Sequence, residues 1–338
     1  MNMLKEIARF TSDFANYGIL HAIAKARINY PAPLDSIENW QFWTTPTSPL
    51  LDFLIKAHPS KATQKAYLES MWQNSHADGI EAHYDVSNDF YDLFLDRKYK
   101  FYTCAEYYNE AETIEQAQEN KAIYLRGLMR LSGDEKILDL GCGWGAMLKF
   151  LRDSGHRGEL SGYTLSKEQL AYNQSLGFSA SLTNFITDPF EGAPYDRIYS
   201  IGSFEHIRPQ ELKSVYQKVY DALTPNGIAV HQFFSYECDP NPSEVLLGQI
   251  FFPGSILSPH SYHLEVAESV GFKITHDSIH DYKPTLRAWY DRLVENQEKA
   301  LEIVDVQTYN RYMTFFATSW VFFQKKQADL HRIVMEKV

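Results

Sequence analysis

The stretch KILDLGCGWGAMLKFLRD, residues 136–153, decides the fold of this 338-residue chain. It begins with a short apolar run, passes through closely spaced glycines, and then has the pattern of a helix. Glycine has no Cβ, so it allows a tight turn after a strand and a close approach of a ligand to the backbone. A dinucleotide site would space its glycines G-x-G-x-x-G and seat a pyrophosphate on the helix N-terminus. Here the spacing is G-x-G-x-G, and Asp139 two residues earlier favours a cationic ligand, such as a sulfonium nucleoside with an amino-acid tail.

The same plan of strand, turn and helix recurs along the chain. ELSGYTLSKEQLAYNQSLG (159–177) repeats it, and DRIYSIGSFEHI (196–207), GIAVHQFFS (227–235) and GFKITHDSIHD (271–281) supply further strands. Strands that alternate with helices predict a parallel sheet with helices on both faces. The end of the chain is predicted to be helical, around residues 283–304 and 306–324. Thr113 is the expected N-cap of a helix that continues to residue 131.

Residues 1–75 are predicted to be a helical N-terminal extension, with short helices separated by prolines. They hold seven Lys and Arg against six Asp and Glu, a net charge of +1, whereas the whole chain carries −11. A near-neutral segment lies on an anionic surface more easily than an acidic one, so peripheral contact with a membrane is one interpretation. A solvated helical extension is the alternative.

The composition excludes several classes of protein. A net charge of −11 argues against a nucleic-acid partner, because phosphates attract the opposite charge. No run approaches the ~18 apolar residues of a membrane span, and the N-terminus has no signal-peptide core. Three cysteines (104, 142 and 238) cannot form a disulfide framework, so we expect a cytoplasmic location, with membrane association left open. Cys104, His206 and His231 lack the paired spacing of zinc ligands, so no metal is expected.

The glycine turn in DLGCGWG resembles the first motif of S-adenosylmethionine-dependent methyltransferases. The resemblance implies S-adenosylmethionine as cofactor, held by Asp139, Gly141 and Gly143. The second strand ends in GYTLSKEQ without the usual carboxylate, so the candidates there are Thr164, Leu165 and Gln169. Asp188 follows the place where the third strand should end and is assigned to the adenine amine. A turn or cap residue is an equally good interpretation of Asp188.

Several further stretches resemble one family. They are HYDVSNDFYDLFLD (83–96), YTCAEYY (102–108), GYTLSKEQ (162–169), SIGSFEHI (200–207) and DYKPTLRAWY (281–290), in this order. Together they resemble the cyclopropane fatty acid synthases, which include the mycolic acid cyclopropane synthases. The resemblance implies a Rossmann-like class I methyltransferase domain over residues 76–338, with lipid-binding insertions. It also implies transfer of a methylene group to a double bond of an unsaturated lipid or phospholipid.

The family's chemistry implies a second set of residues. An alkene attacks the sulfonium methyl, and a bound bicarbonate ion then removes a proton so that the ring closes. The resemblance assigns the bicarbonate to the backbone of Cys104 and to Glu205, His231 and Tyr282, listed here with their motifs: YTCAEYY, SFEH, AVHQF and DYKPTL. It assigns Tyr102 and Thr103 to the cofactor. Taken one at a time, these residues would be core or loop residues, and a perturbed pKa of Glu205 is expected if it holds an anion.

The pattern also departs from the family. Arg208 stands where glycine is usual, IFFPGS (250–255) replaces I-F-P-G-G, Gln232-Phe233 replaces Thr-Ile, and the segment between His231 and Phe251 is short. The alternative is therefore a C- or N-methyltransferase of the same fold that does not close a ring. Aromatic residues make up 14% of the chain, and Phe90 and Tyr91 either stabilise a carbocation or pack in the core. A homodimer is compatible with either activity.

Overall fold

The computed structural model describes residues 2–56, 86–236, 250–252 and 257–338. The chain forms two compact units, and each is described by itself. One contains residues 1–94, 236–256 and 286–328, and the other contains residues 95–235, 257–285 and 329–338. We call them the helical unit and the sheet unit. The expected domain boundary between residues 75 and 76 lies outside the described residues, so that division stays a prediction.

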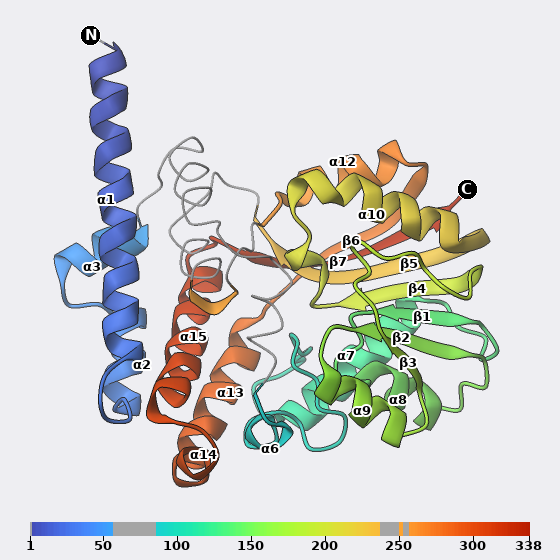
Figure 1. Cartoon of the computed structure of the whole chain (residues 1–338), viewed down its shortest axis with the longest axis horizontal. Helices are drawn as coiled ribbons and strands as arrows, with labels where there is room; N and C mark the ends of the chain where they lie inside the picture. The colour runs from blue at the N-terminus through green and yellow to red at the C-terminus, as the bar shows by residue number, and fades with distance from the viewer. Residues whose placement is uncertain (1, 57–85, 237–249, 253–256) are drawn as a thin grey trace. The chain divides into compact units, whose positions relative to one another are not determined.

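The sheet unit is built on seven strands in the order β3-β2-β1-β4-β5-β7-β6 (Figure 1). The strands are β1 (Ile137–Leu140), β2 (Leu160–Thr164), β3 (Ser179–Leu182), β4 (Tyr195–Ile201), β5 (Leu223–Ser235), β6 (Phe272–His280) and β7 (Asp329–Lys337). The first five pair in parallel. Together with the helices on its faces, this sheet confirms the α/β methyltransferase fold class.

The last strand corrects two expectations. β7 pairs antiparallel with both β5 and β6, so the sheet is mixed and not wholly parallel. The sequence pattern predicts a helix that ends near residue 324 and no strand after it. In β7 both faces are buried along its middle, and two of its buried residues, His331 and Arg332, are polar. The alternation of apolar and polar residues that identifies a strand is therefore weak here.

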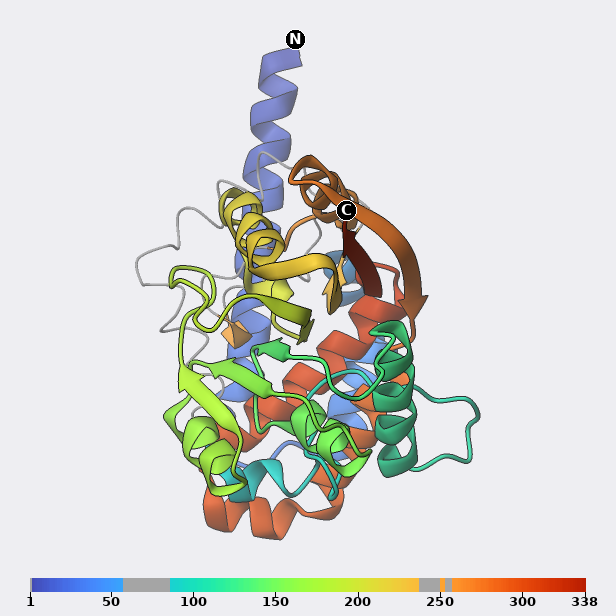
Figure 2. The same cartoon turned by 90° about the vertical axis from the view of Figure 1, so that its right-hand side faces the viewer.

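Helices cover both faces of the sheet, as predicted (Figures 1 and 2). One face carries α7 (Ile114–Leu128), α8 (Ala146–Asp153) and α9 (Lys167–Ser175), and the other carries α10 (Pro209–Ala222) and α12 (His260–Ser269). Side chains alternate across a strand. In β5, Ile228 and Val230 therefore pack in the core under α7 and α8, whereas Ala229 and Phe233 pack in the core under α10 and α12. Thr113 caps α7 in a capping box with Gln116, which confirms the predicted start of that helix.

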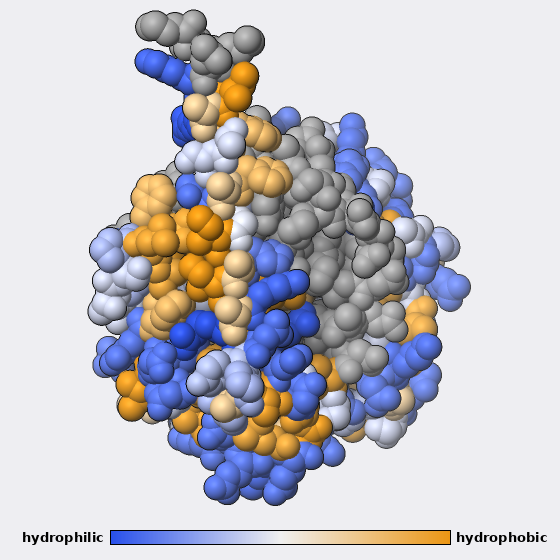
Figure 3. All heavy atoms as spheres, turned by 60° about the vertical axis from the view of Figure 1, so that its left-hand side comes forward, coloured by the Kyte–Doolittle hydropathy of each residue, from blue (hydrophilic) through white to orange (hydrophobic). Residues whose placement is uncertain are grey.

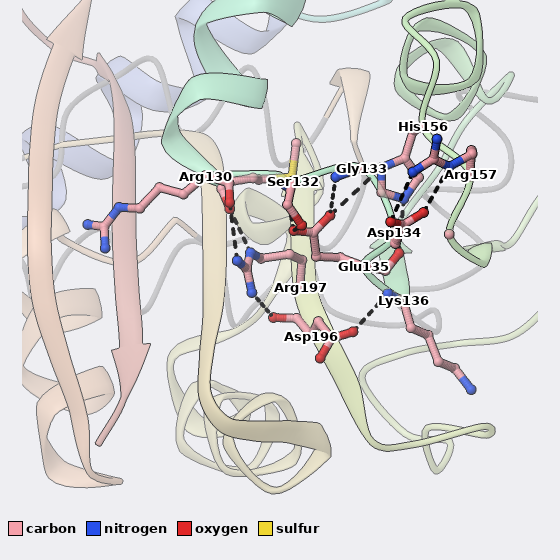
Figure 4. A network of polar contacts seen from close by, with 12 residues as sticks. Arg130, Ser132, Gly133, Asp134, Glu135, Lys136, His156, Arg157, Asp196 and Arg197 are labelled. Carbon is pink, nitrogen blue, oxygen red and sulfur yellow. Dashed lines mark hydrogen bonds and ion pairs between the residues drawn. The ribbon is translucent and has the colours of Figure 1, made fainter.

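The amino ends of β1 and β4 are fixed by a polar network (Figure 4). Burial opposes ionisation of Glu135, but hydrogen bonds from the Ser132 hydroxyl and amide, both at 2.6 Å, and from the Gly133 amide at 2.9 Å lower its pKa to about 2. Arg197 of β4 donates from Nε to the carbonyl of Met129 at 2.6 Å. This network lies at the amino ends of these two central strands, on the side of the sheet away from their carboxyl ends. It therefore anchors the sheet and leaves the carboxyl ends for the ligand.

The helical unit contains α1 (Asn2–Ile28), α2 (Ser36–Thr44), α3 (Pro49–Lys56), α6 (Asn88–Tyr91), most of α13 (Lys283–Glu295), α14 (Gln297–Ile303) and α15 (Val306–Gln324). The first three confirm the helices predicted near the N-terminus. α1 and α2 pack on α15, whereas residues 7–12 of α1 are exposed. The buried Asn39 amide donates to the carbonyl of Met313 at 3.2 Å, and Trp43 is 1% exposed.

Two residues considered for carbocation stabilisation instead lie in this core. Phe90 and Tyr91 are almost fully buried, and the Tyr91 hydroxyl lies 2.7 Å from that of Tyr312. The Phe90 ring meets the Tyr312 ring edge to face at 4.9 Å between centroids. They therefore have the packing role that the sequence left open. Among the described residues, no helix combines the length and apolarity needed to cross a bilayer.

Candidate active site

The glycine turn lies at the carboxyl end of β1, where open α/β sheets bind ligands. Gly141, Gly143 and Gly145 all have positive φ, at +90°, +54° and +70°. A Cβ on Gly141 would stand 2.7 Å from the Cβ of Ser203, whereas one on Gly143 would meet nothing within 4 Å. Gly141 thus permits close packing, and Gly143 faces open space in a backbone conformation that other residues rarely adopt.

A residue that sequence reasoning missed fixes this turn. The Asn173 side chain, on α9, is fully buried and donates from Nδ2 to the carbonyl of Gly143 at 2.7 Å. The same nitrogen donates to the carbonyl of Gln169 at 2.8 Å. α9 therefore fixes the glycine turn that follows β1. The role of Asn173 is visible only from this tertiary contact.

Asp139 is a buried carboxyl beside the glycine turn. It is 3% exposed, and within the described chain its Oδ1 has no hydrogen-bond partner. Burial raises the pKa of Asp139 to about 8, and the nearby Tyr199 hydroxyl offsets only part of this effect. A cationic ligand would restore the charged form of the carboxyl and would satisfy the orphan oxygen. The residues present therefore fit a sulfonium or ammonium ligand.

The candidates after β2 are brought together by hydrogen bonds. The Thr164 hydroxyl donates to Oε1 of Gln169 at 2.7 Å, and both side chains are buried. Leu165 follows directly and is partly buried. Asp188 is different: its carboxylate accepts from the Asn184 amide and from the Thr187 hydroxyl, both at 2.9 Å. Those bonds are typical of the turn residue that the sequence left open, and its contact with adenine stays a prediction.

Tyr102 and Thr103 lie in a loop that meets the carboxyl end of β4. A Cβ on Gly202 would stand 2.5 Å from Cγ2 of Thr103, so loop and strand end are in close contact. Lys121 of α7 is fully buried and donates from Nζ to the Thr103 hydroxyl at 2.7 Å. Desolvation lowers the pKa of this lysine well below its ordinary value. Tyr102 is partly buried in the same loop.

Glu205 lies in a short 3-10 helix, η1 (Phe204–His206), just after β4. It is 7% exposed, and the part of the chain that the structure describes offers its Oε2 no hydrogen-bond partner. Burial raises the pKa of Glu205 to about 8, although the amides of Glu205 and Phe234 partly offset this effect. The expected perturbation of its pKa is thus confirmed. Its Oε1 lies 3.8 Å from the Cβ position of Gly202, which also contacts Thr103.

His231 is a fully buried residue of β5. Its Nδ1 lies 2.9 Å from the Ser200 hydroxyl, and its ring stacks on Phe204 at 3.8 Å between centroids. Burial lowers the pKa of His231 to about 3, so the imidazole is neutral. Its Nε2 has no partner among the described residues. A core histidine with one hydrogen bond has this geometry, but so does a ring nitrogen kept available for a ligand.

Cys104 and the segment around Tyr282 lie side by side. The Cys104 thiol contacts the carbonyls of Ala105 at 3.3 Å and Asp281 at 3.6 Å, and the Ala105 amide donates to Thr285 at 3.0 Å. Burial raises the pKa of the Cys104 thiol to about 12, so the side chain is an inert, buried group. Tyr282 stands between Asp281 and Thr285 and is partly buried. If Cys104 binds a ligand, its backbone does so.

A buried ionic network behind Cys104 was not anticipated. Gln232 donates from Nε2 to the Cys104 carbonyl at 3.4 Å and accepts from Nε of Arg332 at 2.8 Å. Arg332 is fully buried and forms an ion pair with Glu106. Nδ1 of His280 lies 2.7 Å from the same carboxylate. The network ties the loop of Cys104 to β5, β7 and β6, and its members are too distant in sequence to form a motif.

Comparison with known proteins places the chain in a family. Residues 72–333 match the family model for mycolic acid cyclopropane synthetase. A probable fatty acid methyltransferase of Mycobacterium tuberculosis is 30% identical over 78% of this chain and 63% of its own length. Cyclopropane mycolic acid synthase 3 of the same organism is 28% identical over 78% of this chain and 98% of its own length.

Solved structures agree with this assignment. The crystal structure of the mycolic acid cyclopropane synthase CmaA1, complexed with SAH and CTAB, superposes with a TM-score of 0.71. It is 26% identical, and the match covers 78% of this chain and 99% of that one. This chain therefore belongs to the mycolic acid cyclopropane synthetase family of S-adenosylmethionine-dependent methyltransferases.

Proposed function

We propose that this enzyme transfers a methylene group from S-adenosylmethionine to a double bond of an unsaturated acyl chain. The observation that carries the proposal is a buried carboxyl just after β4 and a buried imidazole of β5 that stands opposite Ser200, near the carboxyl end of β4. Glu205 and His231 each keep one polar atom without a partner in the described chain, and burial opposes the charge on both. Two neutral groups of this kind can hold a small anion without repelling it.

The cofactor half of the site lies at the carboxyl ends of β1 and β2. The residues assigned to it are Asp139, Gly141, Gly143, Thr164, Leu165, Gln169 and Asp188, with Tyr102 and Thr103 from the loop before α7. When bound, S-adenosylmethionine supplies an electrophilic methyl group on a sulfonium centre. The unpaired oxygen of Asp139 would accept from its ammonium group, and Gly143 would let the ligand approach the backbone.

The base half of the site is assigned to Cys104, Glu205, His231 and Tyr282. A bicarbonate ion held there would supply the base that removes a proton from the transferred methyl group. With a pKa of about 8, Glu205 is mainly protonated at neutral pH and can donate a hydrogen bond to the anion. The neutral imidazole of His231 carries one N–H and can donate a second.

A lipid substrate is supported by the names of the relatives and by the surface of the helical unit. The names refer to fatty acids and to mycolic acid.

Ile7, Phe10 and Phe14 lie on one side of α1 and are 54%, 38% and 36% exposed. Such a stripe, beside basic residues of the same helix, can insert into a membrane interface. In Figure 3 the N-terminal part of α1, at the top, carries apolar residues next to hydrophilic ones.

The surface proposal can be tested without removing the N-terminal helices, which pack in the core. Changing Phe10 and Phe14 to Ser should weaken sedimentation with anionic vesicles and should leave S-adenosylhomocysteine binding unchanged. Changing Ile123, an exposed residue of α7, to Ser is the matched control. Equal vesicle binding by all three proteins would exclude α1 as the membrane contact. The homodimer and the cytoplasmic location stay predictions.

The reaction is tested on unsaturated phospholipid vesicles with S-adenosylmethionine. Mass spectrometry should detect a gain of one CH₂, and chromatography should identify a ring. Glu205→Leu, which removes the hydrogen-bond donor, should lower ring closure by ~10²–10⁴, the usual range for loss of general-base catalysis, because the base would no longer be held in place. Glu265→Leu, an exposed change on α12, is the control. Wild-type turnover by Glu205→Leu, with or without bicarbonate, would refute the proposed role.

Methyl transfer without ring closure is the second candidate. The observation that favours it is Gln232, which stands where the resemblance leads us to expect threonine and is committed to Cys104 and Arg332. The first relative described above is also named a fatty acid methyltransferase. A product with a methyl branch or a displaced double bond, formed at the full rate by the wild-type enzyme, would establish this candidate instead.

A further inference from the structure

The sheet unit contains a cluster of two histidines and one aspartate outside the site described above. His260 begins α12, Asp277 lies in β6 and His331 lies in β7. In the pairing of β6 with β7, Asp277 stands opposite Ile333 and Ile279 stands opposite His331. Asp277 and His331 therefore project from the same face of the sheet, which is the face that α12 covers. From these three residues we infer a binding site for a divalent transition-metal ion, such as Zn²⁺.

The distances suit a metal ion after a small adjustment. Nε2 of His260 lies 2.8 Å from Oδ2 of Asp277, and Nδ1 of His331 lies 3.9 Å from Oδ1 of Asp277. One ligand atom from each residue lies within 4.8 Å of the other two. Around a tetrahedral zinc ion with bonds of 2.0–2.1 Å, neighbouring ligand atoms are about 3.3 Å apart. The two measured distances fall on either side of this value.

The ligand types and their exposure also fit. Two imidazoles and one carboxylate are a common ligand set for zinc and ferrous ions, and they leave positions for water. The histidine side chains are only 7% and 2% exposed, whereas that of Asp277 is 35% exposed. The carboxylate thus offers a route from solvent to two buried nitrogen ligands. A histidine–aspartate hydrogen bond occupies the position in the absence of metal, and an ion would displace its proton.

Unsatisfied nitrogen atoms point to a missing ligand. Both ring nitrogens of His331 and Nδ1 of His260 have no hydrogen-bond partner within the described residues. The two rings stack at 3.6 Å between centroids and 12° between planes, a contact that satisfies no polar atom. Buried polar groups in native proteins are nearly always paired, so these nitrogens need an explanation. A metal bond would satisfy one ring nitrogen of His331, with Nε2 of His260 as the second imidazole ligand.

The histidines on the other face of β6 make a useful contrast. His276 lies 3.2 Å from the Tyr124 hydroxyl and 2.9 Å from that of Ser278, and His280 pairs with Glu106. Both histidines therefore have protein partners. The earlier expectation of no metal rested on closely spaced ligands. The present cluster is assembled from three separate elements, which that criterion does not test.

An ion at this position would connect α12 to the antiparallel edge of the sheet. The Phe233 ring lies 6.2 and 6.3 Å from the His260 and His331 rings, and Phe233 is two residues from His231 in β5. Because the ion would link α12 to β6 and β7, we expect it to stabilise this part of the sheet. No step of methyl transfer depends on the ion.

The test is a titration of the untagged, full-length, chelator-treated protein with ZnCl₂ alone, by calorimetry and by thermal unfolding. We expect one equivalent to bind and the unfolding temperature to rise. Asp277→Asn and His331→Gln should each weaken binding at least tenfold, and His276→Gln, on the opposite face, should not. X-ray absorption should then show histidine ligands.

Three outcomes would overturn the proposal. They are no saturable binding, binding that survives both Asp277→Asn and His331→Gln, and equal loss of binding in His276→Gln. Asp277 is exposed, so Asp277→Asn keeps the test decisive even if the buried His331→Gln variant does not fold. The titration contains no lipid or S-adenosylmethionine, so its result is independent of the proposed activity.

Discussion

Glu205→Gln in the ligand-free protein should change how stability depends on pH. Burial raises the pKa of this carboxyl to about 8 from its ordinary 4.5. The native protein therefore keeps the proton up to about pH 8, whereas the unfolded chain releases it near 4.5. Because the native state binds more protons in this window, stability falls as pH rises through it. Glutamine has a similar shape and no charge at any pH, so the variant lacks this contribution.

The magnitude follows from the two pKa values. Between pH 6 and pH 9 the wild-type protein should lose about 2–3 kcal/mol more stability than Glu205→Gln. Unfolding entropy of about 2.1 cal/mol/K per residue converts this into a difference of about 3–4 °C in Tm for a chain of this length. Asp139 also has a raised pKa and lowers both curves with rising pH. The difference between the two proteins isolates Glu205.

The assay is thermal unfolding followed by circular dichroism at pH 6 and pH 9, at equal ionic strength and in buffers freed of bicarbonate. The Tm of Glu205→Gln relative to wild type should be higher at pH 9 than at pH 6. Glu265→Gln, in which an exposed carboxyl is changed, should follow the wild type. Parallel behaviour of wild type and Glu205→Gln would mean that Glu205 is ionised in the native protein. Its proposed role as a hydrogen-bond donor to an anion would then be wrong.

Four other changes test the cofactor site and the core. Gly143→Val should abolish calorimetric binding of S-adenosylhomocysteine, because a branched residue at φ +54° is strained and fills the open side of the turn; unchanged affinity would contradict this. Asp139→Asn should weaken that binding and remove its pH dependence. The affinity of the wild-type protein should rise several-fold per pH unit from pH 6 to 8, because the carboxyl ionises as the pH approaches its pKa of about 8. A wild-type affinity that does not change with pH would refute an ion pair between Asp139 and the ammonium group of the ligand. Asn173→Ala should lower stability by about 1–3 kcal/mol in urea unfolding, because it leaves the Gly143 carbonyl without its donor, and should also raise the cofactor Kd; a change in stability alone would separate Asn173 from the site. Trp43→Ala should cost about 3–5 kcal/mol, since this ring is 1% exposed in the helical unit, and a loss below 1 kcal/mol would show that α2 is not part of that core.

The parts of the structure that local sequence specifies were predictable. The glycine turn, the Thr113 cap and the predicted strands β1, β2, β4, β5 and β6 depend on residues close together in the chain. Thr164 and Gln169 also meet, because they flank one turn. Each of these features follows from backbone conformation or side-chain period over a few residues.

The parts that depend on distant partners were not predictable. Arg332 looks like a surface residue in the sequence, yet it is fully buried because Glu106 and Gln232 meet it from other elements. The bond from Asn173 to Gly143 crosses from one helix to another element's turn. Asp188 accepts hydrogen bonds from Asn184 and Thr187 of its own turn, as the turn interpretation predicts, and its contact with adenine stays a prediction. A single sequence does not encode such pairings in a readable pattern.

The position of β7 makes the order of assembly differ from the order of synthesis. β5 and β6 leave the ribosome first, yet among the described strands of the finished sheet β6 pairs with β7 alone, and β7 separates it from β5. Until residues 329–337 have been made, the β5 edge is open and β6 has no strand to join. Open edges of this kind invite pairing with other chains. A nascent chain that ends before residue 329 therefore exposes strand edges that chaperones can bind. The sheet can be completed only after residues 329–337 have been translated.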